Sequence, residues 1–205
     1  MQITQPSYQD RKPRLAHPWT GRARRLVIGV ALFCGLLAGT LLAECGEAGG
    51  FTEYQVKALF LLNFTKYVDW PAEAFAGADA PITIGVLGEN HFGDDLKKAV
   101  EGKTVNGRAI AVQAVDKESD LGKCHVLFIS ASEKKRLGEI LGKMKTLPVL
   151  TVGESEQFTQ QGGIINFVKK DGKVRLEIDL NAARQAKLQI SSKLLSVADT
   201  VRGKQ

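Results

Sequence analysis

The residue pair with the most chemical potential in this chain is Cys124-His125, a nucleophile and a base next to each other in the sequence. The pair begins a continuous apolar run that ends at Ile129, a pattern that predicts a strand buried on both faces. Neighbouring side chains on a strand point to opposite faces of the sheet, so this thiol and this imidazole cannot form a catalytic dyad. We interpret Cys124 as a small buried hydrophobic residue and His125 as a hydrogen-bonded residue of the sheet.

Other catalytic patterns are absent from the sequence. His91 follows an apolar run, but no second or third metal ligand is spaced with it. Gly85-Val-Leu-Gly88 lacks the full G-x-G-x-x-G spacing of a dinucleotide site, and no nucleophile elbow, phosphate-binding P-loop or zinc-binding helix occurs. We therefore predict that the chain is not an enzyme and has no catalytic residues, no metal and no cofactor.

Small and polar residues follow three apolar runs that predict strands, at 82–87, 124–129 and 148–152. In open parallel sheets, ligands bind beyond the carboxyl ends of the strands. A small-molecule pocket could therefore form there, although ordinary turn chemistry explains the same residues. The residues of this candidate pocket are Gly88, Asn90, Ser130 and Gly153.

The stretch 162–180 predicts a β-hairpin. Asp171-Gly172 suits a two-residue type I′ turn, and alternating apolar residues flank it on both sides. This turn pairs Lys170 with Lys173, and therefore Phe167 with Leu176 on a core face.

The second face of the hairpin mixes apolar, amide and charged residues, which a solvated face seldom does. We expect another element or a binding partner to cover it. A partner would contact this face together with the neighbouring C-terminal helix predicted at 191–202. A buried polar network under a helix is the alternative interpretation. The candidate partner-binding residues are Asn166, Val168, Arg175 and Glu177.

The rest of the pattern alternates strands and helices. Thr52 and Gln55 form a capping box for a helix that should end near Val68, and Ser132 should cap a second helix that ends near Met144. These two helices and a third at 92–100 are interspersed with four predicted strands, at 82–87, 108–115, 124–129 and 148–152. The apolar stripe predicted for the first helix consists of Val56, Leu59, Phe60, Asn63, Phe64 and Tyr67.

Repeated strand-helix-strand units predict right-handed crossovers and a parallel sheet. We therefore predict an α/β fold: a three-layer Rossmann-like sandwich with a mostly parallel sheet and an added antiparallel hairpin.

The first 48 residues indicate export. Six basic residues precede an apolar run from Leu26 to Leu42, which small and polar residues follow, as in a secretory signal peptide. We expect residues 1–48 to be a cleaved signal peptide and short linker, and residues 49–205 to form one exported domain. An uncleaved membrane anchor remains an alternative, as does a lipoprotein attached through Cys45.

The positive charge of the chain lies in this leader. Residues 1–43 carry six Lys or Arg and one acidic residue, which is +5 of the total +6. The remaining domain is near neutral, so the composition gives no support to nucleic-acid binding.

Four segments of the sequence carry a family resemblance, namely EYQVKALFLLNFTKYVDWP from Glu53, CHVLFIS from Cys124, VLTVGE from Val149, and the hairpin stretch continued by ISSKLL to Leu195. With this spacing the chain resembles the YfiR-like periplasmic proteins. The resemblance implies an exported, non-catalytic repressor that binds the periplasmic sensor domain of a YfiN-like inner-membrane diguanylate cyclase and lowers cyclic-di-GMP signalling. It also implies a YfiB-like outer-membrane lipoprotein that withdraws the repressor.

Two other classes of function remain open at this point. A periplasmic small-molecule sensor or accessory protein for a histidine kinase or an outer-membrane transport system would use the strand-end pocket. An enzyme would have to depend on His91 or Ser130. A homodimer is compatible with any of the three.

Overall fold

A computed structural model describes residues 50–204, and the predicted signal peptide lies outside these described residues. The helices are α2 (Glu53–Tyr67), α3 (Asp95–Val100), α4 (Leu137–Met144), α5 (Leu180–Gln185) and α6 (Ser192–Leu195), with 3₁₀ turns η1 (Ala72–Ala74), η2 (Glu118–Lys123) and η3 (Ala131–Arg136). The strands are β1 (Val68–Asp69), β2 (Ile82–Leu87), β3 (Thr104–Val105), β4 (Arg108–Val115), β5 (Val126–Ile129), β6 (Leu150–Gly153), β7 (Ile165–Lys170), β8 (Lys173–Asp179), β9 (Gln189–Ile190) and β10 (Thr200–Arg202).

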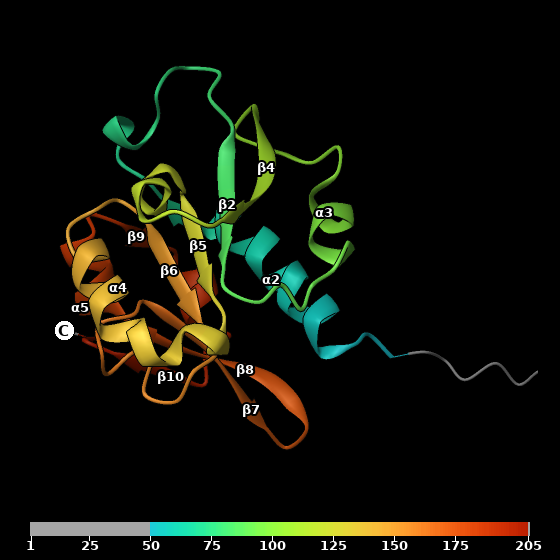
Figure 1. Ribbon diagram of the computed structural model, residues 1–205, viewed down its shortest axis with the longest axis vertical. Helices are drawn as coiled ribbons and strands as arrows, with labels where there is room; N and C mark the ends of the chain where they lie inside the picture. The colour runs from blue at the N-terminus through green and yellow to red at the C-terminus, as the bar shows by residue number, and fades with distance from the viewer. Residues whose placement is uncertain (1–49, 205) are drawn as a thin grey trace, which may run out of the picture. The chain divides into compact units, whose positions relative to one another are not determined.

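Eight of the described strands form one sheet, in the order β10-β8-β7-β6-β5-β2-β4-β3 (Figure 1). The five central strands from β7 to β4 are mutually parallel, whereas β8 pairs antiparallel with β7 and β3 pairs antiparallel with β4. A separate two-stranded ribbon joins β1 to β9. The predicted fold class, a mostly parallel α/β sheet with an added antiparallel hairpin, is confirmed.

The sheet separates two hydrophobic cores. Val126 and Phe128 of β5 face the core that α2 and α3 cover, whereas Leu127 and Ile129 face the core that α4 covers. All four side chains are at most 1% exposed. This alternation places helices on both faces of the sheet and explains why β5 is a continuous apolar run in the sequence.

The hairpin has the predicted register. Lys170 pairs with Lys173 and Phe167 pairs with Leu176. Asp171 and Gly172 have φ values of 51° and 71°, as a type I′ turn requires. The turn residues and the alternating pattern agree, and together they fix which side chains enter the core.

The first helix begins as predicted but buries a different face. The Thr52 side chain accepts from the Gln55 N–H, and the Gln55 side chain accepts from the Thr52 N–H. Leu59 of the predicted stripe is 40% exposed and Asn63 is only half-buried. Apolar residues surround most of this helix, so their spacing alone does not select the inner face. The buried residues of α2 are Lys57, Ala58, Leu61, Leu62, Phe64 and Thr65.

Two predicted helices differ in the structure. Ser130, not Ser132, caps the 3₁₀ turn η3, and α4 begins only at Leu137. The predicted helix at 191–202 is wrong, because α6 ends at Leu195 and the chain then forms β10. The parallel pairing of β10 with β8 and the Asp199 N–H bond to the Leu176 carbonyl override helical spacing here.

Within residues 50–204, no helix combines the length and the apolar character that crossing a membrane requires.

Candidate functional site

The carboxyl ends of β2 and β5 form the topological switch point of the sheet. From β2 the chain continues to α3 on one face, and from β5 it continues through η3 to α4 on the other face. The two chain segments approach each other closely here. Gly88 has a φ of 85°, and a Cβ at this position would lie 2.4 Å from Ser132 Oγ. The Glu89 N–H donates to the same Oγ at 2.9 Å, so the crevice is closed at its base.

A buried ion-pair network lies beside this crevice. The side chain of Lys57 from α2 is 5% exposed, and its Nζ lies 2.7 Å from carboxylate oxygens of both Glu154 and Glu53. Glu154 directly follows β6, and its side chain is 7% exposed. Its carboxylate also accepts from the Tyr54 hydroxyl at 3.1 Å and from the Ala131 N–H at 3.2 Å. Every polar group of this cluster therefore has a partner within the chain.

Electrostatics shifts the pKa values of two groups in the network, Tyr54 and Glu53. Burial, followed by the negative charge of Glu154, raises the pKa of Tyr54 above its usual value of 10.0. The hydrogen bond from Lys57 lowers the pKa of Glu53. At neutral pH the Tyr54 hydroxyl therefore stays protonated and donates, and the Glu53 carboxylate stays ionised and accepts.

This network fills the place where open α/β sheets usually hold a ligand. The Glu154 carboxylate accepts the Ala131 N–H at the end of β5, as the anionic group of a ligand would do. The signal for this arrangement was present in the sequence as Tyr54, Lys57 and Glu154, but reasoning from sequence missed it, because Lys57 and Glu154 are 97 residues apart.

The predicted pocket residues separate into two groups. Gly88 and Asn90 line a hollow of about 120 Å³ that Lys97 and Gln113 also line. Asn90 Oδ1 accepts from the Phe92 N–H at 3.0 Å.

The other two predicted pocket residues do not line this hollow. Ser130 is fully buried, and a Cβ on Gly153 would lie 2.2 Å from ring carbons of Phe158. Phe158 fills the space that a ligand would need at the end of β6.

The predicted partner-binding residues lie on the second face of the hairpin, as the register requires. Asn166 is 2% exposed and donates from Nδ2 to the Ser155 carbonyl at 3.1 Å. Val168 and Glu177 are half-buried, and Arg175 is exposed. Three of the four side chains thus reach the surface, while Asn166 anchors the strand beneath them.

The first face of the hairpin borders a groove against α2. Its volume is about 490 Å³, and the side chain of Phe51 at its mouth is 73% exposed. Lys169 of the hairpin contacts Glu53 of α2 at 3.3 Å across it. Sequence analysis missed this groove, because the half-exposed α2 residues were assigned to the core. It is lined by Phe51, Glu53, Val56, Phe60, Lys169, Gly172, Lys173 and Val174.

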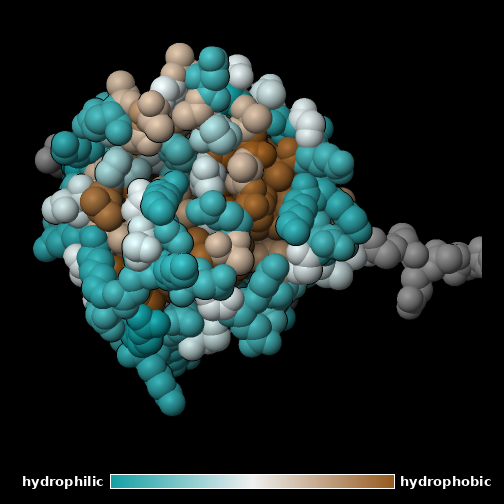
Figure 2. All heavy atoms as spheres, turned by 45° about the horizontal axis from the view of Figure 1, so that its top comes forward, coloured by the Kyte–Doolittle hydropathy of each residue, from teal (hydrophilic) through white to brown (hydrophobic). Residues whose placement is uncertain are grey.

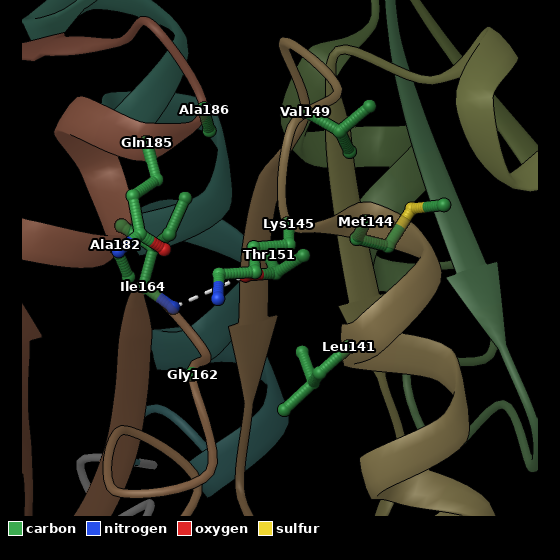
Figure 3. A pocket seen from close by; sticks show the side chains of 10 residues that line it. All are labelled: Leu141, Met144, Lys145, Val149, Thr151, Gly162, Ile164, Ala182, Gln185 and Ala186. Carbon is green, nitrogen blue, oxygen red and sulfur yellow. Dashed lines mark hydrogen bonds between the residues drawn. The ribbon is translucent and has the colours of Figure 1, made fainter.

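A third feature is a small cavity between α4 and α5 (Figure 3). Thr151 Oγ1 accepts from the Ile164 N–H at 3.1 Å beside it, a bond that ties β6 to the start of β7. The volume of the cavity is about 10 Å³, which is only enough for a single water molecule. This cavity is therefore too small for a ligand.

Cys124 and His125 have separate surroundings, as their alternation on a strand predicts. The Cys124 thiol packs in the core beneath α4, and burial raises its pKa. His125 is 7% exposed, stacks on Phe75 at 4.5 Å between ring centroids, and accepts from the Thr83 N–H through Nδ1 at 3.0 Å. No group of three or more potential metal ligands occurs among residues 50–204.

The fold and this site define a Rossmann-like α/β domain whose strand-end crevice is filled by its own side chains. The chain belongs to the YfiR/HmsC-like family, because the family model matches residues 54–199. A comparison with curated proteins found no match.

Solved structures resemble the chain in fold. A "conserved domain protein" from Vibrio cholerae O1 biovar El Tor matches with a TM-score of 0.51 and 12% identity over 75% of this chain. The match spans about 62% of that protein's length. An ABC domain in complex with L-Trp from Streptococcus pneumoniae matches with a TM-score of 0.42 and 12% identity, covering 58% of this chain and 56% of the other. The first likeness shows the fold alone, and the second is too distant to add to it.

We expect Glu154→Ala to lower the free energy of unfolding by about 3 kcal/mol, because it leaves the buried Lys57 ammonium with Glu53 as its one carboxylate partner. The loss of stability in the double variant Lys57→Met/Glu154→Ala should be smaller than the sum of the losses in the two single variants, by about 1 kcal/mol or more. The reason is that the double variant leaves no buried charge unpaired. Urea denaturation of the three variants measures both values. Glu139→Gln, which breaks an exposed pair with Lys143, should change stability little. Strictly additive losses would contradict the structural role of the pair.

The structure also predicts a pH dependence of stability through His125. Burial, with a contribution from the charge of Arg108, lowers the pKa of this imidazole below 6.5. The fold therefore holds the neutral form, and unfolding takes up a proton once the pH falls below about 6.5. The stability present above that pH should decline as the medium is acidified, and His125→Gln should flatten this decline in denaturation curves. His91→Gln, at an exposed position, is the matched control and should leave the decline unchanged.

Proposed function

We propose that this chain is an exported regulator that binds the periplasmic sensor domain of a YfiN-like inner-membrane diguanylate cyclase and represses cyclic-di-GMP synthesis. The observation that carries the proposal is membership of the YfiR/HmsC-like family over residues 54–199. Neither the substrate nor the product of such a cyclase is present in the periplasm. The regulator must therefore act through contact with the receptor.

The arrangement of the strand ends supports a role by contact. A small-molecule sensor would need a pocket there, and the hollow beside Gly88 and Asn90 has a volume of about 120 Å³. Most ligand pockets measure roughly 300–1,000 Å³. With the Glu154 carboxylate already holding Lys57 and Tyr54, this end of the sheet favours a structural role over ligand binding.

We assign the receptor contact to the second face of the hairpin. Val168, Arg175 and Glu177 offer one apolar, one basic and one acidic side chain on adjacent strands, and the buried amide of Asn166 fixes the strand below them. Such a mixed surface can discriminate between partners through its charges. A YfiB-like lipoprotein would relieve repression by competing for the regulator.

Repression then follows from a difference in affinity. A receptor that exists in an active and an inactive conformation is shifted by the regulator only as far as the two affinities differ. Moving such an equilibrium from 1:99 to 99:1 takes about a 10⁴-fold preference, or about 5.5 kcal/mol. A few well-ordered side chains on a rigid hairpin can supply a difference of this size.

Deletion of the gene should raise cellular cyclic-di-GMP and biofilm formation, and expression of the intact chain should restore both. Mass spectrometry of nucleotide extracts gives the cyclic-di-GMP level. Unchanged levels after deletion, in a strain that contains a periplasmic-sensor cyclase, would refute repression.

Arg175→Glu should weaken binding of the chain to the purified receptor sensor domain by tenfold or more, because it reverses the one exposed charge of the proposed contact. Calorimetry measures the affinity, and an unchanged melting temperature shows that folding is intact. Lys145→Glu makes the same charge change at an exposed position after α4 and should bind like the wild type. Equal affinity of the two variants would place the contact elsewhere.

A further inference from the structure

The buried imidazole of His125 is held at only one of its two nitrogens. Nδ1 accepts from the Thr83 N–H at 3.0 Å, so the ring is neutral and carries its proton on Nε2. Nε2 is buried and has no hydrogen-bond partner among the described residues, although the Ala74 carbonyl faces it. A second proton would have to enter at Nδ1, where it would break the bond to Thr83. The closed structure therefore accepts the neutral ring only.

The same ring is the innermost layer of a stack that holds the loop 71–81. Phe75 of this loop stacks on the imidazole, with 4.5 Å between the ring centroids. The Arg108 guanidinium lies over the Phe75 ring, 4.0 Å from its centroid. One face of a ring has room for one planar group, so Phe75 lies between the imidazole and the guanidinium. Arg108 also donates to the Gly77 and Ala80 carbonyls at 2.9 and 2.7 Å.

Little else holds this loop, which projects between η1 and β2 in Figure 1. The backbone amides of the loop that donate to a carbonyl bond within the loop itself. Residues 76–80 read AGADA and have small side chains with little to bury. Figure 2 turns the top of Figure 1 toward the viewer and shows weakly hydrophobic and hydrophilic residues along the upper border. The pair of Glu73 with Lys187 joins two exposed side chains and contributes little.

A charged imidazole would meet positive charge here. Arg108 of β4 lies on the far side of Phe75, and its charge opposes protonation of the ring. No described carboxylate lies within ion-pair distance of the ring, and the acidic loop residues Glu73 and Asp79 are exposed. Trp70 packs at 78° to the imidazole and adds no charge. Protonation would therefore place two positive charges on either side of one aromatic ring.

We infer that His125, Phe75 and Arg108 form an acid-sensitive latch: when His125 takes up a proton, its ring leaves the stack and the loop 71–81 detaches while the sheet stays folded. The sheet can stay folded because neither His125 nor Phe75 belongs to the two hydrophobic cores. In the open state the imidazole is in water and has its ordinary pKa of about 6.5. The ratio of open to closed molecules should therefore rise up to about tenfold for each pH unit below about 6.5. This latch needs no receptor and goes beyond the proposed repression.

Trp70 reports the state of the latch, because its Nε1 donates to the His125 carbonyl at 3.1 Å and the other tryptophan, Trp19, lies in the predicted signal peptide. The experiment uses the exported chain purified from periplasmic extract. Between about pH 7.5 and about pH 5, the Trp70 emission should shift to longer wavelength and acrylamide should quench it more strongly. An imidazolium that merely quenched the indole in a closed loop would change the intensity but not the access of acrylamide. Unchanged access would overturn the inference.

Hydrogen exchange separates local opening from unfolding. Over the same pH range, the amides of Ala74, Phe75 and Ala80 should lose protection relative to an unstructured chain, whereas those of Leu150–Gly153 in β6 should keep it. Loss of protection in both segments at the same pH would mean unfolding of the whole domain and would overturn the inference.

Substitutions identify the titrating group. His125→Gln offers an oxygen to the Thr83 N–H but takes up no proton, so the access of acrylamide to Trp70 should no longer depend on pH. His91→Gln, at an exposed position, should keep the wild-type dependence. A wild-type dependence in His125→Gln would overturn the inference.

Phe75→Ala provides a second test if His125→Gln does not fold. This variant removes the layer that joins the loop to the ring, so Trp70 should be accessible already at about pH 7.5 and should gain little on acidification. A rise on acidification equal to that of the wild type would overturn the inference.

Discussion

The structure depends on one buried ion pair between Lys57 of α2 and Glu154 at the end of β6. An ammonium and a carboxylate that are both almost excluded from water are stable only when each has its partner and further hydrogen bonds. Glu53, Tyr54 and the Ala131 N–H supply those bonds. The pair thereby fixes the first helix against the carboxyl edge of the sheet, where parallel α/β domains usually present their chemistry.

This constraint explains why the strand ends offer so little room. The glycine at the end of β2 lets Ser132 approach, and the one at the end of β6 lets the Phe158 ring lie against the backbone. In other sheets of this class, glycines at these positions bring the backbone close to a ligand. Here the same freedom brings side chains of the chain itself into contact at the strand ends.

Sequence reasoning found the elements whose signals are local. Asp171-Gly172 and its alternating neighbours determined the hairpin and its register, and the capping box at Thr52 determined the start of α2. Sequence reasoning failed for elements whose structure depends on a segment far away in the sequence. The inner face of α2 depends on Glu154, 97 residues away from Lys57, and the C-terminal strand forms because β8 offers an edge. A lysine inside a helix is usually solvent-exposed, so nothing near Lys57 marked it as buried.

The ion-pair network itself adds little to how firmly the hairpin is held. From Glu154 the contacts pass through Lys57 to Glu53, and from Glu53 to Lys169 of β7 at 3.3 Å. The first two carboxylate contacts are to a buried ammonium, whereas Lys169 is exposed and contributes little. Packing holds the base of the hairpin instead, because Phe167 and Leu176 are buried and Asn166 donates to the Ser155 carbonyl, whereas residues 169–173 at the tip are exposed. Strands that are already ordered by packing have little backbone freedom left to lose when a partner binds, and this lowers the entropy cost of binding.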